Sequence, residues 1–421
     1  MPKHKVYFDY AASTPVAPEV EAAMRPYFLN KFGNAGSLHS FGQEAIATLD
    51  EARETIANAI GAAFREIIFT GSATEANNLA LRGAIKSFKH HASGIKKPRI
   101  IVSAIEHESV LETARDLQDE GVEVVYLPVS KNGIADLKKL KKSLSENTVL
   151  VSVMYANNEI GTIQPIREIS KIISEFRNKK EYPLFHTDAV QAFQFLDCDV
   201  RNLGVDLITM SAHKIYGPKG IGALYVGSRV QGIGYSEKQK KFINPKPYTL
   251  TPIITGGGQE FGMRSGTENV PLVVGFAKAV SLVSNFRQRR TGALARRSHW
   301  RRRELENKRI SKLRDYFWKE LKKIYPAAKR NGDPKNVLSN FLNVYFPDYE
   351  SADLLVGFDL AGLAVSAGSA CSARSAQPSY VMKALDFNEK QSRRNIRFTL
   401  GRPTSKKDID KALKIIKNVI T

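Results

Sequence analysis

Residues 207–214 of this chain read Leu-Ile-Thr-Met-Ser-Ala-His-Lys, and residues 215–220 continue Ile-Tyr-Gly-Pro-Lys-Gly. The apolar first half is typical of a buried strand, and the Gly-Pro-x-Gly that follows predicts a turn. Lys214 is therefore expected at the carboxyl end of a strand. A lysine there can form a Schiff base with an aldehyde cofactor if its pKa is lowered, although an isolated lysine in a loop is more often simply solvated.

Strand-like and helix-like segments alternate around this stretch. This alternation predicts an α/β fold with a mostly parallel sheet, in which ligands bind at the carboxyl ends of the strands. A second, smaller domain is expected after about residue 270, and residues 228–252 are expected to form a long loop. The predicted strands are 66–70, 99–103, 122–127, 149–155, 183–187, 205–211, 341–346 and 395–400, and the predicted helices are 75–88, 109–120, 135–145, 166–177, 270–284, 380–385 and a final one from 406.

The chain is long enough for two domains, with 421 residues and 43% hydrophobic content. It has no apolar run of about 18 residues and no signal-like start, so we expect a cytoplasmic protein that does not enter a membrane. The net charge is +21, and residues 287–303 contain eight arginines and no acidic residue. A basic excess of this kind can indicate RNA or an acidic protein as a partner, but a solvated basic helix or a disordered insertion is the commoner explanation.

Other polar residues also follow predicted strands. Asp188 ends the segment Phe-His-Thr-Asp, and pyridoxal 5′-phosphate (PLP) chemistry needs a carboxylate beside its pyridinium nitrogen; alone, Asp188 could equally cap a helix. Ala73 and Thr74 open a helix after a Gly-containing turn, where free N–H groups favour a phosphate. An ordinary capped helix would explain the same residues.

Further candidates are a histidine, two amides, an arginine and a cysteine. His107 could stack on a cofactor ring and move protons, and Asn158 and Gln191 could hydrogen-bond cofactor or substrate. Arg397 could hold a substrate carboxylate through two parallel hydrogen bonds. Cys371 lies among small residues, where an exposed thiol invites a chemical role, whereas Cys198 is expected to pack as a small apolar residue in or near a strand.

Taken in order, these motifs resemble the cysteine desulfurases, within the class V aminotransferase-like PLP enzymes, over nearly the whole chain. The resemblance rests on residues 7–15, 71–78, 106–107, 157–161, 186–191, 211–214, 256–260, 264–267 and 369–371. It implies an aspartate-aminotransferase-like large domain with a mixed, mostly parallel sheet over residues 16–268. Residues 1–15 and 269–421 would form a smaller α+β domain, with a cysteine loop at about 362–378 and a basic helical or disordered insertion at 285–310.

The resemblance also implies the roles of the site residues. Lys214 would bond to PLP and act as base, Asp188 would pair with the pyridinium nitrogen, His107 would stack on the ring, and Gln191 would contact its phenolic oxygen. The phosphate would be held by Ala73, Thr74, Ser211 and His213, and by Thr267 of a partner subunit in a homodimer. Asn158 and Arg397 would hold L-cysteine, and Cys371 would take its sulfur as a persulfide. No metal ligand is implied.

The expected product is L-alanine, and the expected sulfur acceptor is an iron–sulfur scaffold or another acceptor protein, with tRNA thiolation as a further outlet. Residues 34–39 read Asn-Ala-Gly-Ser-Leu-His where the family usually has Asn-Pro-Ser-Ser before the histidine, which weakens the transfer of fine substrate contacts to this loop. An aminotransferase has no need of Cys371, but selenocysteine lyase activity stays open. A catalytically inactive sulfur carrier or nucleic-acid-binding protein is disfavoured by the intact Lys214, Asp188 and Cys371.

Overall fold

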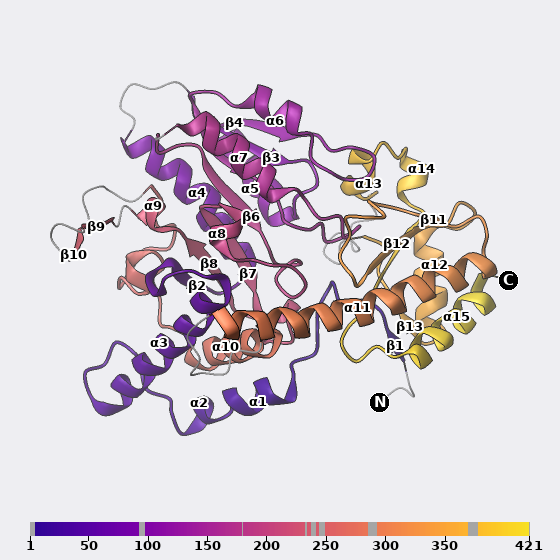
Figure 1. The fold of residues 1–421 in the computed structure, drawn as a ribbon, viewed down its shortest axis with the longest axis horizontal. Coiled ribbons are helices and arrows are strands. Elements are labelled where there is room, and N and C mark those ends of the chain that lie inside the picture. The colour runs from indigo at the N-terminus through magenta and orange to yellow at the C-terminus, as the bar shows by residue number, and fades with distance from the viewer. Residues whose placement is uncertain are drawn as a thin grey trace.

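The computed structural model describes residues 5–91, 97–178, 180–231, 234–236, 241–243, 249–284, 293–368 and 378–420, without the side chains of 91, 234–236, 241–243, 284 and 293–302. A seven-stranded sheet forms the centre of the larger unit, in the order β2-β8-β7-β6-β5-β3-β4 (Figure 1). Only β8 runs antiparallel to its neighbours in this sheet, which confirms the predicted mixed, mostly parallel α/β sheet. The strands are β2 (Ile67–Thr70), β3 (Arg99–Ser103), β4 (Glu123–Leu127), β5 (Thr148–Ser152), β6 (Leu184–Asp188), β7 (Leu207–Ser211) and β8 (Gly222–Val226).

Helices cover both faces of this sheet, which explains why the inner strands β5, β6, β7 and β8 are buried along their whole length. Helices α4 and α5 pack on one face, around Leu79 and Val110. Helices α3, α7 and α10 contribute to the core on the other face, through residues such as Leu49, Ile169 and Phe276. The helices of this unit are α1 (Pro18–Met24), α2 (Pro26–Leu29), α3 (Ser40–Ile60), α4 (Ala73–His91), α5 (Glu108–Asp119), α6 (Leu137–Ser143), α7 (Ile166–Arg177), α8 (Val200–Leu203), α9 (Ser228–Gln231) and α10 (Val270–Ser284), with short 3₁₀ turns η1 (Phe64–Glu66), η2 (Ala212–Lys214) and η3 (Glu260–Gly262).

The smaller unit has its own sheet and its own core. Its antiparallel strands pair in the order β11-β12-β14, and β1 of the N-terminus pairs with β13. Val6 and Phe8 pack in the same core as Phe317, Phe358 and Phe398, which supports the predicted grouping of residues 1–15 with the C-terminal part. The elements are β1 (Val6–Tyr7), β11 (Lys329–Arg330), β12 (Phe341–Tyr345), α12 (Ser351–Leu360), β13 (Leu363–Ala364), α13 (Tyr380–Ala384), α14 (Glu389–Ser392), β14 (Asn395–Thr399) and α15 (Lys406–Ile420).

The division between the units stays a prediction, but packing favours a later boundary than residue 268. Helix α10 contributes Val273, Phe276 and Val280 to the core of the larger unit. The helix packs against α1 and α3, and it is apolar on nearly all sides, as expected of a buried helix.

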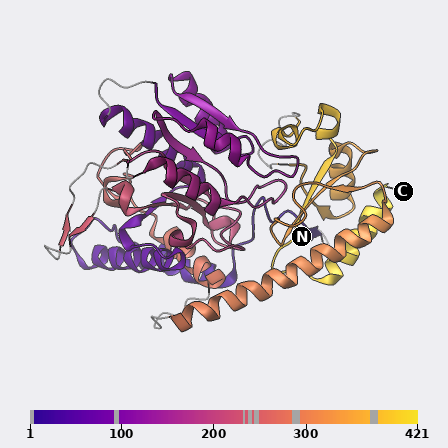
Figure 2. The ribbon, with the colours of Figure 1, turned by 45° about the horizontal axis from the view of Figure 1, so that its top comes forward.

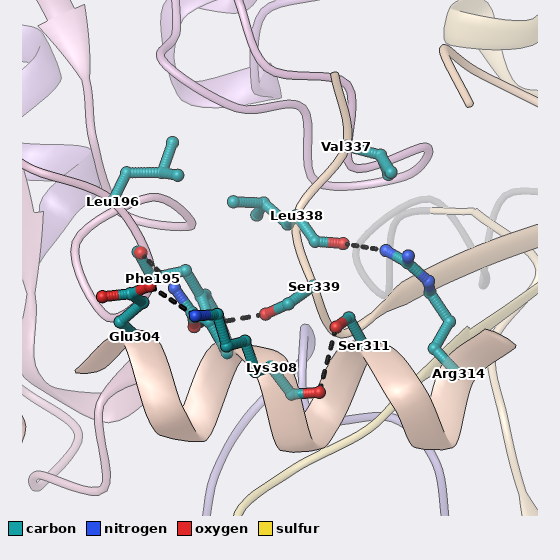
Figure 3. Close-up of a pocket in the computed structure, with 10 residues that line it drawn as sticks. Phe195, Leu196, Glu304, Lys308, Ser311, Arg314, Val337, Leu338 and Ser339 are labelled. Carbon is teal, nitrogen blue, oxygen red and sulfur yellow. Dashed lines mark hydrogen bonds and ion pairs between the residues drawn. The ribbon is translucent and has the colours of Figure 1, made fainter. Parts of the chain in front are cut away.

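Helix α11 (Ala293–Ile324) runs along both units (Figure 2). Arg303 and Asn307 donate hydrogen bonds to the carbonyls of Leu196 and Phe195 in the larger unit, at 2.6 and 2.7 Å. Farther along, Phe317 packs in the core of the smaller unit. A small cavity of about 240 Å³ lies between α11 and the loops that carry Leu196 and Leu338 (Figure 3).

Two expectations about irregular segments are refined by the structure. Residues 293–310 of the basic 285–310 segment are helical, and residues 285–292 lie outside the described part of the chain. The segment 228–252 is not one long loop, because it contains α9 and a short hairpin of β9 (Gly234–Ser236) and β10 (Lys241–Ile243). Within the described residues, none of the helices is both long and apolar enough to cross a bilayer.

Candidate active site

Asp188 and Lys214 lie at the same edge of the central sheet, as their spacing after predicted strands indicated. Asp188 is the last residue of β6, and Lys214 ends η2, which follows β7 directly. The two strands are parallel neighbours, with Asp188 opposite Thr209. Because parallel strands end at one edge, the acid and the lysine come from adjacent strands into one region.

The carboxylate of Asp188 is buried and firmly held. Its Oδ2 accepts a hydrogen bond from Nδ2 of Asn77 at 2.9 Å, and its Oδ1 accepts one from the amide of Val190 at 2.9 Å. Asn77 also donates to Oγ of Ser109 at 2.8 Å. Asn77 therefore orients the acid, a role that the sequence did not assign, although Asn77 lies one helical turn after the predicted phosphate turn.

The amine of Lys214 lies against the N-terminal segment of the chain. Its Nζ donates to the carbonyl oxygens of Ala11 and Ala12, each at 2.7 Å. Nε2 of Gln191 donates to the same Ala11 carbonyl at 3.0 Å. The first residues of the chain thus complete the site around the lysine, a contact that no local pattern around Lys214 indicates.

His107 caps helix α5 and is held as a neutral imidazole. Its Nδ1 accepts a hydrogen bond from the amide of Ser109 at 3.1 Å and lies 2.9 Å from Oγ of Ser109. An accepting Nδ1 assigns the proton of the neutral ring to Nε2. Burial lowers the pKa of His107, and the Lys214 charge lowers it further while Asp188 opposes this. The ring therefore stays neutral near pH 7.

The first residues predicted to hold the phosphate lie where helix α4 and strand β8 approach each other closely. Ala73 and Thr74 form the first residues of α4, whose initial N–H groups lack acceptors within the helix. A Cβ on Gly222 of β8 would lie 2.7 Å from the carbonyl carbon of Ser72 and 2.8 Å from the nitrogen of Ala73. Glycine at 222 thus lets strand β8 approach this turn, which the sequence reading missed.

The other residues predicted to hold the phosphate differ in their surroundings. Oγ of Ser211 and Nδ1 of His213 lie 2.8 Å apart. Burial and the Lys214 charge lower the pKa of His213 to about 3, so its ring is neutral. Thr267 is exposed on this chain.

Arg397 is almost completely buried, at 1% exposure, and is already partly engaged. One terminal nitrogen pairs with Oδ1 of Asp9 at 2.8 Å, and the other donates to the Asn158 carbonyl at 2.6 Å. Within the described residues, its Nε and Oδ1 of Asn158 are buried without a hydrogen-bond partner. Buried polar atoms of this kind require a partner, and a ligand carboxylate and amine would supply one to each.

The two cysteines differ in what the structure describes. Cys198 is buried in the main core, and burial raises its pKa to about 12. This confirms that it packs as a small apolar residue, although it lies in a loop rather than in a strand. Cys371, the predicted nucleophile, lies outside the described residues.

Comparison with known proteins assigns the family. The aminotransferase class-V family profile matches residues 6–412. The chain belongs to this family. It is 42% identical over 419 residues to "Cysteine desulfurase IscS" of Dictyoglomus turgidum, covering 99% of this chain and 95% of that protein.

Solved structures agree with this assignment. A "NifS-like protein" superimposes with a TM-score of 0.83 at 32% identity over 99% of both chains. A structure titled "SspA in complex with cysteine" has a TM-score of 0.73 at 36% identity, over 94% of this chain and 99% of that one. The family resemblance and the fold expected from the sequence are thereby confirmed.

The chain is a PLP-dependent enzyme by its family, and the described residues fit that cofactor. Asp188 supplies a fixed buried carboxylate, Lys214 a primary amine, and the α4 turn opposite Gly222 a set of N–H groups for a phosphate. The orphaned oxygen of Asn158 offers a further acceptor near the same strands. The individual residue roles stay predictions.

Proposed function

We propose that this protein is a cysteine desulfurase that moves the sulfur of L-cysteine onto Cys371 and releases L-alanine. The observation that carries the proposal is the meeting of Lys214, Asp188 and neutral His107 at one sheet edge. The buried Arg397, which donates to the Asn158 carbonyl, supports it. The likeness to a protein named cysteine desulfurase over 99% of the chain supports it.

When bound, PLP supplies an electron sink for the bonding electrons of the substrate's α-carbon. Asp188, which is held by Asn77 and Val190, would keep the pyridine nitrogen protonated. Lys214 takes the α-proton of cysteine at its Nζ, and the neutral His107 assists proton movement through its ring nitrogens. Nε of Arg397 and the amide of Asn158 orient the substrate's carboxylate and amine.

The sulfur step balances in atoms and charge. The Cys371 thiolate attacks the sulfur of cysteine, so that an S–S bond forms as the Cβ–S bond breaks. A proton then replaces the sulfur at Cβ and gives alanine, while the enzyme keeps a persulfide. Cys198 cannot substitute for Cys371, because its thiol is buried and its raised pKa keeps it protonated.

The partners belong to the same proposal. An iron–sulfur scaffold or another acceptor protein receives the persulfide sulfur, with tRNA thiolation as an alternative outlet. A homodimer is supported by the exposure of Thr267, which in the family acts in the neighbouring subunit's site.

Only the first part of the arginine run is proposed as a basic surface for a partner. Arg303 already donates to the Leu196 carbonyl, and beyond the run Arg309 donates to the carbonyls of Arg402 and Thr404. These two arginines help to fix α11 and are therefore not available to bind a partner. Contact with RNA or an acidic protein through Arg287–Arg303 is therefore proposed only for residues 287–302.

The decisive experiment compares the wild type with Cys371→Ser. The variant should keep the visible absorbance of bound PLP but lose sulfide release from cysteine under a thiol reductant by at least about a hundredfold. Lys214→Ala is the matched control, because it should lose the absorbance band itself. Wild-type sulfide release by Cys371→Ser would refute the proposal, and parallel assays with selenocysteine would measure its preference for sulfur.

A further inference from the structure

Four polar side chains form one continuous hydrogen-bonded chain between Asp188 and His107. Nδ2 of Asn77 in α4 donates to Oδ2 of Asp188 at 2.9 Å and to Oγ of Ser109 in α5 at 2.8 Å. Oγ of Ser109 in turn lies 2.9 Å from Nδ1 of His107. The acid at the end of β6 and the imidazole at the start of α5 are therefore connected through Asn77 and Ser109.

The carboxylate of Asp188 decides the direction of these hydrogen bonds. A carboxylate only accepts, so the amide of Asn77 must turn its nitrogen toward Asp188. The opposite orientation would place Oδ1 of Asn77, which is buried and has no partner among the described residues, against an oxygen of Asp188. Because Asn77 also donates to Oγ of Ser109, this hydroxyl accepts one bond and keeps its own hydrogen for Nδ1 of His107.

The main chain of α5 favours the same state of His107. His107 is the N-cap of this helix, and its Nδ1 accepts the amide hydrogen of Ser109 at 3.1 Å. The helix fixes this amide, so a proton on Nδ1 would point at another proton that cannot turn away. Nδ1 therefore accepts from both the amide and the hydroxyl of Ser109, and the ring's own proton lies on Nε2.

Charged groups on three elements also act on the ring of His107. Burial lowers its pKa, and the charge of Lys214 in η2 lowers it further, whereas Asp188 of β6 and Glu108 of α5 raise it. His213, also in η2, brings no charge, because its own pKa is lowered to about 3. Since these charges oppose one another, the hydrogen bonds that Nδ1 accepts become decisive, because they stabilise only the ring that is unprotonated there.

We propose that Ser109, oriented by Asn77, is a positioning residue that fixes His107 in the neutral tautomer with its proton on Nε2. His107 then offers this N–H as a hydrogen-bond donor to negative charge that develops in the reaction, and Lys214 takes the α-proton. A neutral imidazole at a helix N-terminus can act in this way as an electrophilic group. The inference rests on the proposed desulfurase function and adds to it the direction of the hydrogen bond that His107 makes.

Three substitutions separate the hydroxyl of Ser109 from ordinary helix capping. Ser109→Ala removes the hydroxyl but keeps the amide that His107 caps, and Ser109→Thr restores a hydroxyl at the same position. Thr113→Val, one turn later in α5, is the matched control. Oγ1 of Thr113 donates to the Ser109 carbonyl at 2.9 Å, so this variant also loses a hydroxyl from the first turns of α5 but no hydrogen bond to His107.

The experiment follows the ring nitrogens of His107 by NMR in the full-length holoenzyme labelled with ¹⁵N-histidine, without cysteine and at several pH values. His107→Asn identifies the signals. In the wild type, Nε2 should carry the proton and Nδ1 should be unprotonated. Ser109→Ala should raise the midpoint of the His107 titration by about one pH unit, since the lost hydrogen bond favoured the neutral ring. Ser109→Thr should restore the wild-type midpoint, and Thr113→Val should keep it.

Sulfide release gives a second measurement. The rate of Ser109→Ala relative to the wild type should fall as the pH is lowered through the raised midpoint, and recover to within about twofold above it.

Two results would overturn the inference. One is a neutral wild-type ring with its proton on Nδ1 of His107. The other is an unchanged His107 titration in folded Ser109→Ala, or the same change in Thr113→Val. If Ser109→Ala fails to fold, Asn77→Leu gives the same test, because it leaves the Ser109 hydroxyl free to turn away from Nδ1. Absence of sulfide release by the wild type would instead refute the proposed function, and would leave the nitrogen signals measured without cysteine unaffected.

Discussion

At the scale of single residues, the candidate site is built from predicted groups held by unpredicted partners. Asp188 and Lys214 could be found because each follows an apolar strand, and parallel strands end at one edge. Their partners, Asn77 and the carbonyls of Ala11 and Ala12, come from distant parts of the chain. A sequence read locally gives the end of a strand, but it does not give which remote group will meet it there.

Glu106 provides a test of electrostatics at this scale. Its carboxyl group is completely buried, and its Oε1 accepts a hydrogen bond from the amide of Met154 at 2.5 Å. Burial, and secondarily the charge of Asp188, raises its pKa well above the usual 4.5. The raised pKa favours the neutral form of the group, and Glu106→Gln should preserve its shape and its acceptor oxygen.

The pH dependence of that substitution follows from proton linkage. Above pH 4.5 the unfolded chain releases this proton and the folded chain keeps it, so the wild type loses stability as pH rises toward the folded pKa. Between pH 4.5 and the raised folded pKa, Glu106→Gln should therefore gain up to about 1.4 kcal/mol per pH unit relative to the wild type, and the gain should level off above that pKa. Urea denaturation of both proteins at several pH values measures this. A pH-independent difference would show that Glu106 is ionised in the folded protein.

At the scale of elements, amphipathic or strongly apolar segments were predictable and short or alanine-rich ones were not. The bounds of α7 and α10 agree with the predicted 166–177 and 270–284. Strand β8 was missed because it begins with Gly222 and Ala223, which have low strand propensity. Helix α3 was missed because alanines such as Ala45 and Ala52 form much of its buried face and give a weak apolar signal.

Strand β8, which was not predicted from the sequence, allows a prediction about how tightly the protein retains PLP. In Gly222→Ala, the new Cβ would meet backbone atoms of Ser72 and Ala73, which cannot rotate away. The α4 turn must then shift, and PLP binding should weaken about tenfold or more. Gly71→Ala is the control from the same turn, because its Cβ would meet the end of the Glu75 side chain at 3.0 Å. Equilibrium dialysis of PLP from both variants tests this, and equal retention would argue against a phosphate at this turn.

At the scale of the whole molecule, α11 makes contacts with both units. Its first described contacts are polar and reach the larger unit, through Arg303 and Asn307. Its later residues, among them Ile310 and Phe317, are apolar and complete the smaller unit. The sequence showed the basic character of this helix, but not that its cations and amides would satisfy main-chain carbonyls of the other unit.

Substitutions of the neighbouring residues Asn307 and Lys308 can distinguish the contribution of this hydrogen bond between the units from the contribution of an exposed side chain. Asn307→Ala would leave the Phe195 carbonyl without its donor at 2.7 Å, and should cost about 1–2 kcal/mol of unfolding free energy. Lys308→Ala removes an exposed side chain whose ion pair with Glu304 spans one helical turn, and should cost under about 0.5 kcal/mol. Chemical denaturation of both variants measures the difference. If the two losses are equal, α11 does not link the units through this contact, because the amide of Asn307 would then contribute no more than a solvated lysine.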